Sequence, residues 1–579
     1  MNAKDKRDPT AAAITHDQPV AAAAPLQFWG SDAMAEMLRA LDIPYLAINP
    51  GASYRGLHDS IVNYLGNTRP QMLLCLHEES AVAIAHGYAK VTDRMMGAAV
   101  HSNVGLMHAT MAIFNAWCDR APLLVLGATG PWDAAKRRPW IDWIHTMSDQ
   151  GAMVRGFTKW DNQPGSPVAA QEALLRAAQI ANTAPRGPTY VNLDAALQEQ
   201  KLDALPLLPD AKRYLAPQAV MPAPQLLEAA AKLLSGAKNP MILAGRVSRS
   251  ETGWAERVAL AEKLQARVFT DGKTAAAFPT DHRLAASTPE TFFPPDAAKL
   301  LREADVVLSL DWVDLAGTLR AAWGAQPVGA KVIRVSPDAH LHRGTSMDYQ
   351  GLPPADVYLM CEPDAVVPAL LAAVTARPAV GLPAAPAAPA DDGKLSVAAV
   401  ARALNAASGD RDLCLTHLPL SWNGAYRAFH HPLDYLGQEG GGGVGAGPGL
   451  TVGAALALKG SGRIPVGMLG DGDFLMGATA LWTAVHYQLP CLFLICNNRS
   501  FFNDEVHQER VAKERSRPVE NKWIGMRMTD PEMDLAMIAR GQGAEGIGPV
   551  RHIEDLAKAI ESGIRLASEG KVCVVDIRV

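Results

Sequence analysis

The 579-residue sequence lacks any apolar run near the roughly 20 residues needed to span a bilayer, and its net charge is only −5. This charge gives no reason to expect a nucleic acid or an anionic membrane as partner. The seven cysteines are odd in number and include no CxxC pair. Buried free thiols in a reducing compartment are therefore expected, rather than disulfides.

The N-terminal segment also lacks the continuous apolar core of a signal peptide. It is rich in alanine, proline and charged residues, and we expect residues 1–25 to form a disordered tail. With the unpaired cysteines, this segment predicts a cytoplasmic protein.

Three regions alternate short apolar runs with helical patterns, as stacked βα units with parallel sheets do. A chain of this length exceeds one hydrophobic core. We expect three Rossmann-like α/β domains at residues 26–195, 220–375 and 395–579, with a Pro- and Ala-rich linker at 376–394. The first and third regions share a rhythm, which indicates two similar domains flanking another.

The expected strands are short apolar runs. They lie at 45–50, 72–77, 97–102, 122–130 and 187–194 in the first region; at 240–245, 266–271, 305–311 and 331–338 in the second; and at 464–469, 490–498 and 571–579 in the third.

The stretch "GDGDFLMGATALWTAVHYQLPCLFLICNN", residues 470–498, has polar residues at both ends of one helix–strand unit. In open α/β sheets, ligands bind beyond the carboxyl ends of strands. Asp471 and Asn498 each follow an expected strand, so both should reach the same sheet edge. The backbone N–H groups of Gly472 and Asp473 would open the next helix and favour an anion.

A carboxylate, a side-chain amide oxygen and a nearby backbone carbonyl are hard donors. Together with phosphate oxygens and a water, they would complete an octahedral Mg²⁺ site. In the alternative interpretation, Asp471 only caps a helix and the Asn pair only turns the chain. The two signals together on one strand–helix–strand unit favour the metal site.

The GDG…NN pattern resembles the cofactor motif of thiamine diphosphate (ThDP)-dependent decarboxylases and carboligases. The resemblance covers nearly the whole chain, in the order pyrimidine, middle and diphosphate domain. It implies ThDP and Mg²⁺ as cofactors, with Asp471, Asn498 and the Ser500 carbonyl as metal ligands. The expected diphosphate-side positions are Gly470, Gly472, Asp473 and Asn498.

The stretch "LHEESAVAIAHGYAK", residues 76–90, predicts a helix. One face would carry the apolar residues Ala81, Ile84, Ala85 and Tyr88. Alone, Glu78 at the helix start reads as a surface residue favoured by the helix dipole. The resemblance gives the catalytic role to Glu78 rather than to Glu79. In the family, this glutamate hydrogen-bonds N1′ of the aminopyrimidine and so supports proton loss from C2 of the cofactor. The chemistry of that step belongs to the cofactor itself.

The glycine run "EGGGGVGAGPGLTVGAALAL" contains a formal GxGxxG at Gly440–Gly445. No expected strand precedes it and no acidic residue follows at about 20 positions, so a dinucleotide site is not favoured. The run resembles instead the family loop beneath the pyrimidine ring. This implies that backbone near Gly442 and Val444 binds the ring edge, with Val444 as the wedge where family members often carry Met, Leu or Ile.

Two histidines are candidate catalytic residues. "AAVHSNVGLMHATMAIFNAW" resembles the corresponding stretch of benzoylformate decarboxylases and gives His101, while the shorter match "FPTDH" gives His282. Imidazole titrates near neutral pH and suits proton transfer. A lone histidine after a strand is about as often a packing or capping residue.

Other positions depart from the benzoylformate pattern. "NPGASY" has Ala52 where those enzymes have Ser, and Ser53 follows. After the metal motif, "RSFFNDEVHQERVAKERSRP" is more charged than the expected aromatic stretch. We expect Phe501, Phe502 and Asn503 to reach the substrate, and the run beyond Glu505 to be a solvated helix face or a lid.

Three function hypotheses follow. The first is a non-oxidative 2-oxo acid decarboxylase with carboligase activity. The second is an acetolactate synthase-like carboligase or a 2-hydroxyacyl lyase. This option allows FAD in the middle domain, but no specific flavin signature is present and FAD is not favoured. The third is an inactive regulatory relative, against which intact Glu78, Asp471 and Asn498 argue.

The resemblance also predicts the assembly. In the family, the first and third domains of different subunits share each cofactor. We therefore expect a homodimer or homotetramer, with active sites at the dimer interface, that acts on a small 2-oxo acid or related acyl donor.

Overall fold

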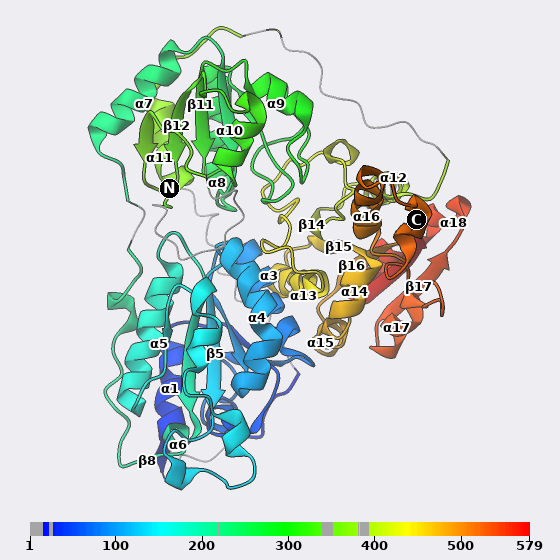
Figure 1. The fold of residues 1–579 in the computed structure, drawn as a ribbon. Coiled ribbons are helices and arrows are strands. Elements are labelled where there is room, and N and C mark those ends of the chain that lie inside the picture. The colour runs from blue at the N-terminus through cyan, green and yellow to red at the C-terminus, as the bar shows by residue number, and fades with distance from the viewer. Residues whose placement is uncertain (1–15, 22–26, 218–219, 339–350, 380, 382–392) are drawn as a thin grey trace.

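A computed structural model describes residues 16–21, 27–217, 220–338, 351–379, 381 and 393–579. Within these residues, three main parallel sheets are each covered by helices, which confirms the predicted α/β class (Figure 1). No helix in the described ranges is long and apolar enough to cross a membrane. All seven cysteines are buried and free. Most of the predicted tail at 1–25 and of the predicted linker at 376–394 lies outside the described residues.

The first domain has a six-stranded sheet in the order β3-β2-β4-β5-β7-β6. Its strands are β2 (Tyr45–Ile48), β3 (Gln71–Leu74), β4 (Met96–Val100), β5 (Leu123–Thr129), β6 (Asp161–Asn162) and β7 (Thr189–Asp194). Its helices are α1 (Gly30–Ala40), α2 (Arg55–Asp59), α3 (Glu78–Thr92), α4 (Ser102–Cys118), α5 (Pro167–Asn182) and α6 (Ala195–Gln198). The short strands β1 (Phe28–Trp29) and β8 (Lys201–Leu202) pair antiparallel beside this sheet.

The middle domain has a five-stranded sheet in the order β10-β9-β11-β12-β13. Its strands are β9 (Pro240–Ala244), β10 (Arg267–Phe269), β11 (Val306–Leu310), β12 (Lys331–Val335) and β13 (Val357–Leu359). Its helices are α7 (Pro224–Gly236), α8 (Glu251–Leu264), α9 (Pro295–Leu301), α10 (Leu315–Trp323) and α11 (Pro363–Ala373).

The third domain also has a five-stranded parallel sheet, but in a different order, β14-β15-β16-β18-β17. Its strands are β14 (Leu413–His417), β15 (Ile464–Gly470), β16 (Cys491–Asn497), β17 (Glu545–Val550) and β18 (Val572–Arg578). Its helices are α12 (Val397–Ser408), α13 (Ala446–Leu458), α14 (Asp471–Gly477), α15 (Ala480–His486), α16 (Phe502–Glu514), α17 (Leu535–Gly541) and α18 (Ile553–Ser568).

The sequence predicts a single helix after the GDG turn, and this prediction is wrong in detail. In the structure the helical segment begins at Asp471 and is divided into α14 and α15. The division follows Gly477, where a Cβ would come within 2.3 Å of the Gly445 carbonyl oxygen. Glycine permits this close approach, and it also weakens a helix interior.

Helices α3 and α13 join the first and third domains in one apolar core, and they lie side by side at the centre of Figure 1. The apolar face predicted for α3 is buried there. The two helices approach closely because each has a glycine at the crossing. A Cβ on Gly87 would meet Leu450, and one on Gly453 would come within 2.0 Å of the Ile84 carbonyl oxygen.

A short part of the predicted tail, residues 16–21, is among the described residues. Asp17 accepts hydrogen bonds from Tyr487 Oη at 2.7 Å and His486 Nε2 at 3.1 Å. This part of the segment therefore lies against α15 instead of extending freely.

Candidate active site

The carboxyl ends of β15 and β16 bring the predicted metal ligands to one edge of the third sheet. The two strands are adjacent and parallel, with Gly470 paired to Cys496. Asp471 follows the first strand and Asn498 follows the second. Both polar ends of the unit thus reach the same edge, as the sequence predicted from the topology of open α/β sheets.

Asp471 is buried, with only 4% of its surface exposed. Its Oδ1 accepts a hydrogen bond from the Gly472 N–H at 2.8 Å, so this N–H is already used in the structure. Its Oδ2 has no hydrogen-bond partner in the part of the chain that is described. Burial raises the pKa of Asp471, although the backbone N–H groups of Gly472, Arg499 and Ser500 oppose that shift. An unpaired buried carboxylate oxygen is costly unless a ligand satisfies it.

The loop after β16 is held in a defined shape. The Asn498 side-chain oxygen accepts from the Ser500 N–H at 2.9 Å. Arg499 between them has a φ of 58°, in the left-handed region that few non-glycine residues adopt. The Ser500 hydroxyl donates to Glu505 Oε1 at 2.5 Å, and Arg527 Nε donates to the same oxygen at 3.1 Å. Glu505 thereby fixes Ser500.

The glycine run lies beside the end of β15. Gly442 has a φ of 70°, and space is open around its Cα. Val444 is 49% exposed, so its side chain is free to contact a ligand. The N–H groups of Gly441 and Gly443 donate to the Asn115 side-chain oxygen at 3.1 and 3.3 Å. Asn115 of α4 thus anchors this loop to the first domain. Asn115 was not among the site residues predicted from the sequence.

A buried ion pair lies beneath the glycine run. His417 Nε2 at the end of β14 lies 2.6 Å from Glu439 Oε2. Burial alone would lower the pKa of His417, but the nearby Glu439 carboxylate raises this pKa to about 9. Nearby Asp473 is also buried, and its Oδ1 accepts from the N–H of Gly445 at 2.6 Å. Asp473 therefore fixes the run from beneath.

Glu78 begins α3 and turns toward α4. It is 6% exposed, and its Oε2 lies 3.0 Å from His108 Nδ1. A Cβ on Gly105 would come within 2.7 Å of the other carboxylate oxygen. The neighbouring Glu79 instead lies near Gly445 of the same chain's third domain, with a Cβ at Gly445 3.7 Å from its Oε1. Adjacent helix positions differ by about 100°, so the two glutamates serve different sides.

His101 follows β4 at the carboxyl edge of the first sheet. Its Nδ1 lies 2.8 Å from Ser53 Oγ, and its ring lies 4.7 Å from the ring of His145. Burial lowers the pKa of His101, and His145 lowers it further. The predicted substrate position Ser53 thus orients His101, while Ala52 is exposed. The neighbouring His145 was missed because it ends a four-residue 3-10 helix, Asp142–His145, which carries no recognisable sequence pattern.

The remaining predicted positions are scattered. The Phe501 ring packs over Gly472, and a Cβ added to Gly472 would lie 2.8 Å from that ring. Phe502 and Asn503 are exposed on α16. His282 lies in the middle domain, where its Nε2 is 3.3 Å from Glu262 Oε1. Within this chain, its described contacts do not join it to the residues around Asp471 or Glu78.

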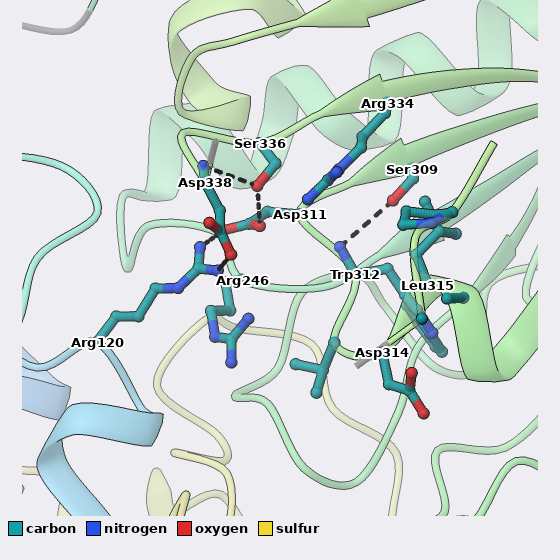
Figure 2. Close-up of a pocket in the computed structure, with 14 residues that line it drawn as sticks. Arg120, Arg246, Ser309, Asp311, Trp312, Asp314, Leu315, Arg334, Ser336 and Asp338 are labelled. Atoms are coloured by element: carbon teal, nitrogen blue, oxygen red, sulfur yellow. Dashed lines mark hydrogen bonds and ion pairs between the residues drawn. The ribbon is translucent and has the colours of Figure 1, made fainter. Parts of the chain in front are cut away.

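At the corresponding edge of the middle sheet, two carboxylates are paired within the protein. Arg120 reaches from the end of α4 and donates to Asp311 Oδ2 at 2.8 Å and to Asp338 Oδ2 at 2.9 Å (Figure 2). The cavity beside this ion pair measures about 30 Å³ among the described residues, about the volume of one water.

The third-domain edge fits ThDP with a divalent cation. Asp471 Oδ2 is an unpaired hard donor, and Asn498 and the Ser500 carbonyl add further oxygen donors of the kind Mg²⁺ prefers. A Cβ on Gly470 or Gly442 would meet only open space, so a ligand can approach the backbone there. The residues present therefore suit both the cofactor and its metal.

The chain is similar to known proteins over most of its length. Benzoylformate decarboxylase of Pseudomonas aeruginosa is 26% identical over 490 residues, which cover 82% of this chain and 86% of that protein. A probable 2-ketoarginine decarboxylase of the same species is 26% identical over 542 residues, which cover 91% and 89%. The solved structure of the ThDP-dependent 4-hydroxybenzoylformate decarboxylase of Rhodococcus jostii matches with a TM-score of 0.77 at 21% identity, over 95% and 99% of the two chains, and shows the same fold.

Three family models match successive parts of the chain. The N-terminal thiamine pyrophosphate-binding domain matches residues 28–153, and the central domain matches 227–351. The C-terminal thiamine pyrophosphate-binding domain matches 420–577. With both cofactor-binding domains and the central domain in order, the chain belongs to the thiamine pyrophosphate enzyme family.

Proposed function

We propose that this protein is a ThDP- and Mg²⁺-dependent decarboxylase of a small 2-oxo acid. The observation that carries the proposal is the buried Asp471 carboxylate, whose Oδ2 has no partner among the described residues and which lies at the strand edge beside Asn498. Asp471, Asn498 and the Ser500 carbonyl would hold the metal. Both decarboxylase relatives, aligned over most of their length, support this reaction class.

When bound, ThDP supplies an electron sink for breaking or making a carbon–carbon bond next to a carbonyl. The chain would supply orientation and proton handling. Glu78 offers its carboxylate to N1′ of the pyrimidine, and Val444 supports the ring. His101, held by Ser53, is placed to move a proton at the reacting carbon.

We further propose that two copies of the chain share each site. The Glu78 carboxylate lies against Gly105 and His108 of α4, whereas Glu79 lies near Gly445 of the third domain in the same chain. Large apolar side chains are exposed on the elements around the site, which supports a covered surface. They are Val104 and Met107 of α4, Val444, Met476 of α14 and Phe502 of α16.

The reaction class can be tested with purified protein, ThDP and Mg²⁺ on a panel of aromatic, branched and basic 2-oxo acids, with CO₂ and aldehyde followed separately. We expect CO₂ and aldehyde in equal amounts from at least one acid. CO₂ release with a coupled ketol and no free aldehyde would favour the carboligase alternative. An absence of turnover and of ThDP binding would favour the regulatory relative.

The shared site can be tested with Glu78→Ala and Asp471→Ala chains carrying different tags. Each parent should be nearly inactive. Purified heterodimers should recover activity, because one of the two sites of each pair would then be intact, as two-fold symmetry requires. Verified heterodimers that stay as inactive as the parents would show that each site is built within one chain.

A further inference from the structure

We propose that His108 is a positioning residue for Glu78, a role that rests on the proposed function. The motif that identifies Glu78 carries no information about His108, which lies 30 positions along the chain on α4. The fold brings His108 Nδ1 within 3.0 Å of Glu78 Oε2. A carboxylate only accepts hydrogen bonds when ionised, so the imidazole is the donor of this pair.

The two oxygens of Glu78 are held differently. His108 takes Oε2, whereas Oε1 lies against Gly105, where even a methyl group would come within 2.7 Å. The glycine leaves this oxygen room, and the hydrogen bond at the other oxygen restricts rotation of the carboxylate. Glu78 is therefore presented in one orientation, with one oxygen left for a ligand.

His108 is itself supported by a second histidine. The rings of His77 and His108 stack with centroids 5.0 Å apart and planes 20° apart. His77 is fixed in turn, because its Nδ1 accepts from the Glu79 N–H at 3.2 Å at the start of α3. Burial and the nearby His108 lower the pKa of His77, so it is favoured as a neutral stacking partner.

The surroundings strengthen this contact in the proposed dimer. The His108 side chain is 53% exposed in the single chain, on the same helix as the exposed Val104 and Met107. A partner covering these side chains would exclude water from the His108–Glu78 pair. Charge-assisted hydrogen bonds gain strength as the local dielectric falls.

The test compares His108→Leu, which removes the donor, with His108→Asn, whose amide can place a donor near the position of Nδ1. His552→Leu makes the same chemical change at an exposed histidine before α18, far along the chain. For each variant, ThDP affinity in the presence of Mg²⁺ and the rate of C2 hydrogen–deuterium exchange of bound ThDP are measured.

We expect His108→Leu to slow exchange about 10- to 100-fold, the effect of losing one hydrogen bond to a charged group, with ThDP affinity changed much less. His108→Asn should restore most of the rate, and His552→Leu should match wild type. An exchange rate for His108→Leu within about twofold of wild type would overturn the proposal. So would a His108→Asn variant as slow as His108→Leu, since that would indicate packing only.

Crystal structures of the cofactor-free variants provide a readout that does not depend on ThDP. The Glu78 carboxylate should leave its position beside Gly105 in His108→Leu and keep it in His108→Asn. An unmoved carboxylate in His108→Leu would overturn the positioning role. If wild type binds no ThDP, the proposed function fails, and this structural comparison still decides the role of His108.

Discussion

The third and middle domains carry similar parallel sheets, but their carboxyl edges differ in how charge is balanced. At the third-domain edge, Asp471 Oδ2 and Asp473 Oδ2 are buried without partners among the described residues. At the middle-domain edge, Asp311 and Asp338 are both paired with Arg120 of the first domain. One edge is left needing a cation, and the other already contains one.

The difference lies in whether the polar atoms at each strand edge are left unsatisfied, and therefore open to a ligand, or are paired within the protein. Buried carboxylates need a counter-charge, which an ion or a side chain can provide. A guanidinium between two carboxylates satisfies both and ties the first domain to the middle domain (Figure 2). Two five-stranded parallel sheets with different strand orders therefore carry a candidate cofactor site at one edge and an interdomain contact at the other.

The largest effect should come from removing the unpaired carboxylate. Asp471→Ala should lose Mg²⁺-dependent ThDP binding and lower activity about 10³-fold or more, since the diphosphate loses its counter-ion. Asp311→Asn is the matched control at the middle-domain edge and should keep ThDP affinity near that of wild type. The ThDP affinity of both variants is measured by titration with ThDP in the presence and absence of Mg²⁺. Tight, Mg²⁺-dependent ThDP binding by Asp471→Ala would remove it from the metal site.

Arg120→Met should make the middle-domain edge resemble the third-domain edge. Two buried carboxylates would lose their cation, which should cost about 3 kcal/mol of stability without weakening ThDP binding. Added Mn²⁺ should then recover part of the lost melting temperature, because a ligand that binds only the native state stabilises it. Arg120→Lys, which keeps the charge, is the control. A melting temperature for Arg120→Met equal to that of wild type would show that the ion pair contributes nothing.

The His417–Glu439 pair predicts how stability beside the third-domain edge depends on pH. Since Glu439 raises the pKa of His417 to about 9, the pair's stabilisation is fully present below the ordinary histidine value and is lost as pH rises through about 9. Glu439→Gln should therefore destabilise the protein by about 2–3 kcal/mol near pH 6 and by less near pH 10. Denaturant unfolding at both pH values tests this. If Glu439→Gln lowered the free energy of unfolding equally at both pH values, His417 would not be the charged partner of Glu439.

The first-domain edge should show the smallest effect. Burial and His145 both lower the pKa of His101, so a neutral His101 should persist to a lower pH than an ordinary histidine. His145→Leu removes one of these causes and should move the acid limb of the activity profile upward by less than about one pH unit. The pH dependence of kcat/KM measures it, with exposed His58→Leu as control. A downward shift would contradict the assigned direction.

Much of the fold was readable from the sequence because its information is local. Each apolar run that forms a central strand is buried and flanked by turn residues, as β15 and β16 are. The edge strands β6, β13, β14 and β17 were missed. The first two have only two or three residues, and β17 contains two glycines and a proline, which are uncommon in strands. The short apolar run of β14 was overlooked. The α14–α15 division was missed because Gly477 looks like an ordinary helix residue until it meets the Gly445 carbonyl.

The sequence by itself determined the family, the three sheets and the positions of Asp471, Asn498 and Glu78, because the chemistry of each is encoded in a short contiguous motif. Only the tertiary structure decided which neighbours complete them. Arg120 and Asp338 are 218 positions apart, and Asn115 and Gly441 are 326 apart. Such contacts depend on how whole domains pack. Whether a buried polar atom is satisfied or left for a ligand is therefore settled by the assembled fold, not by local sequence.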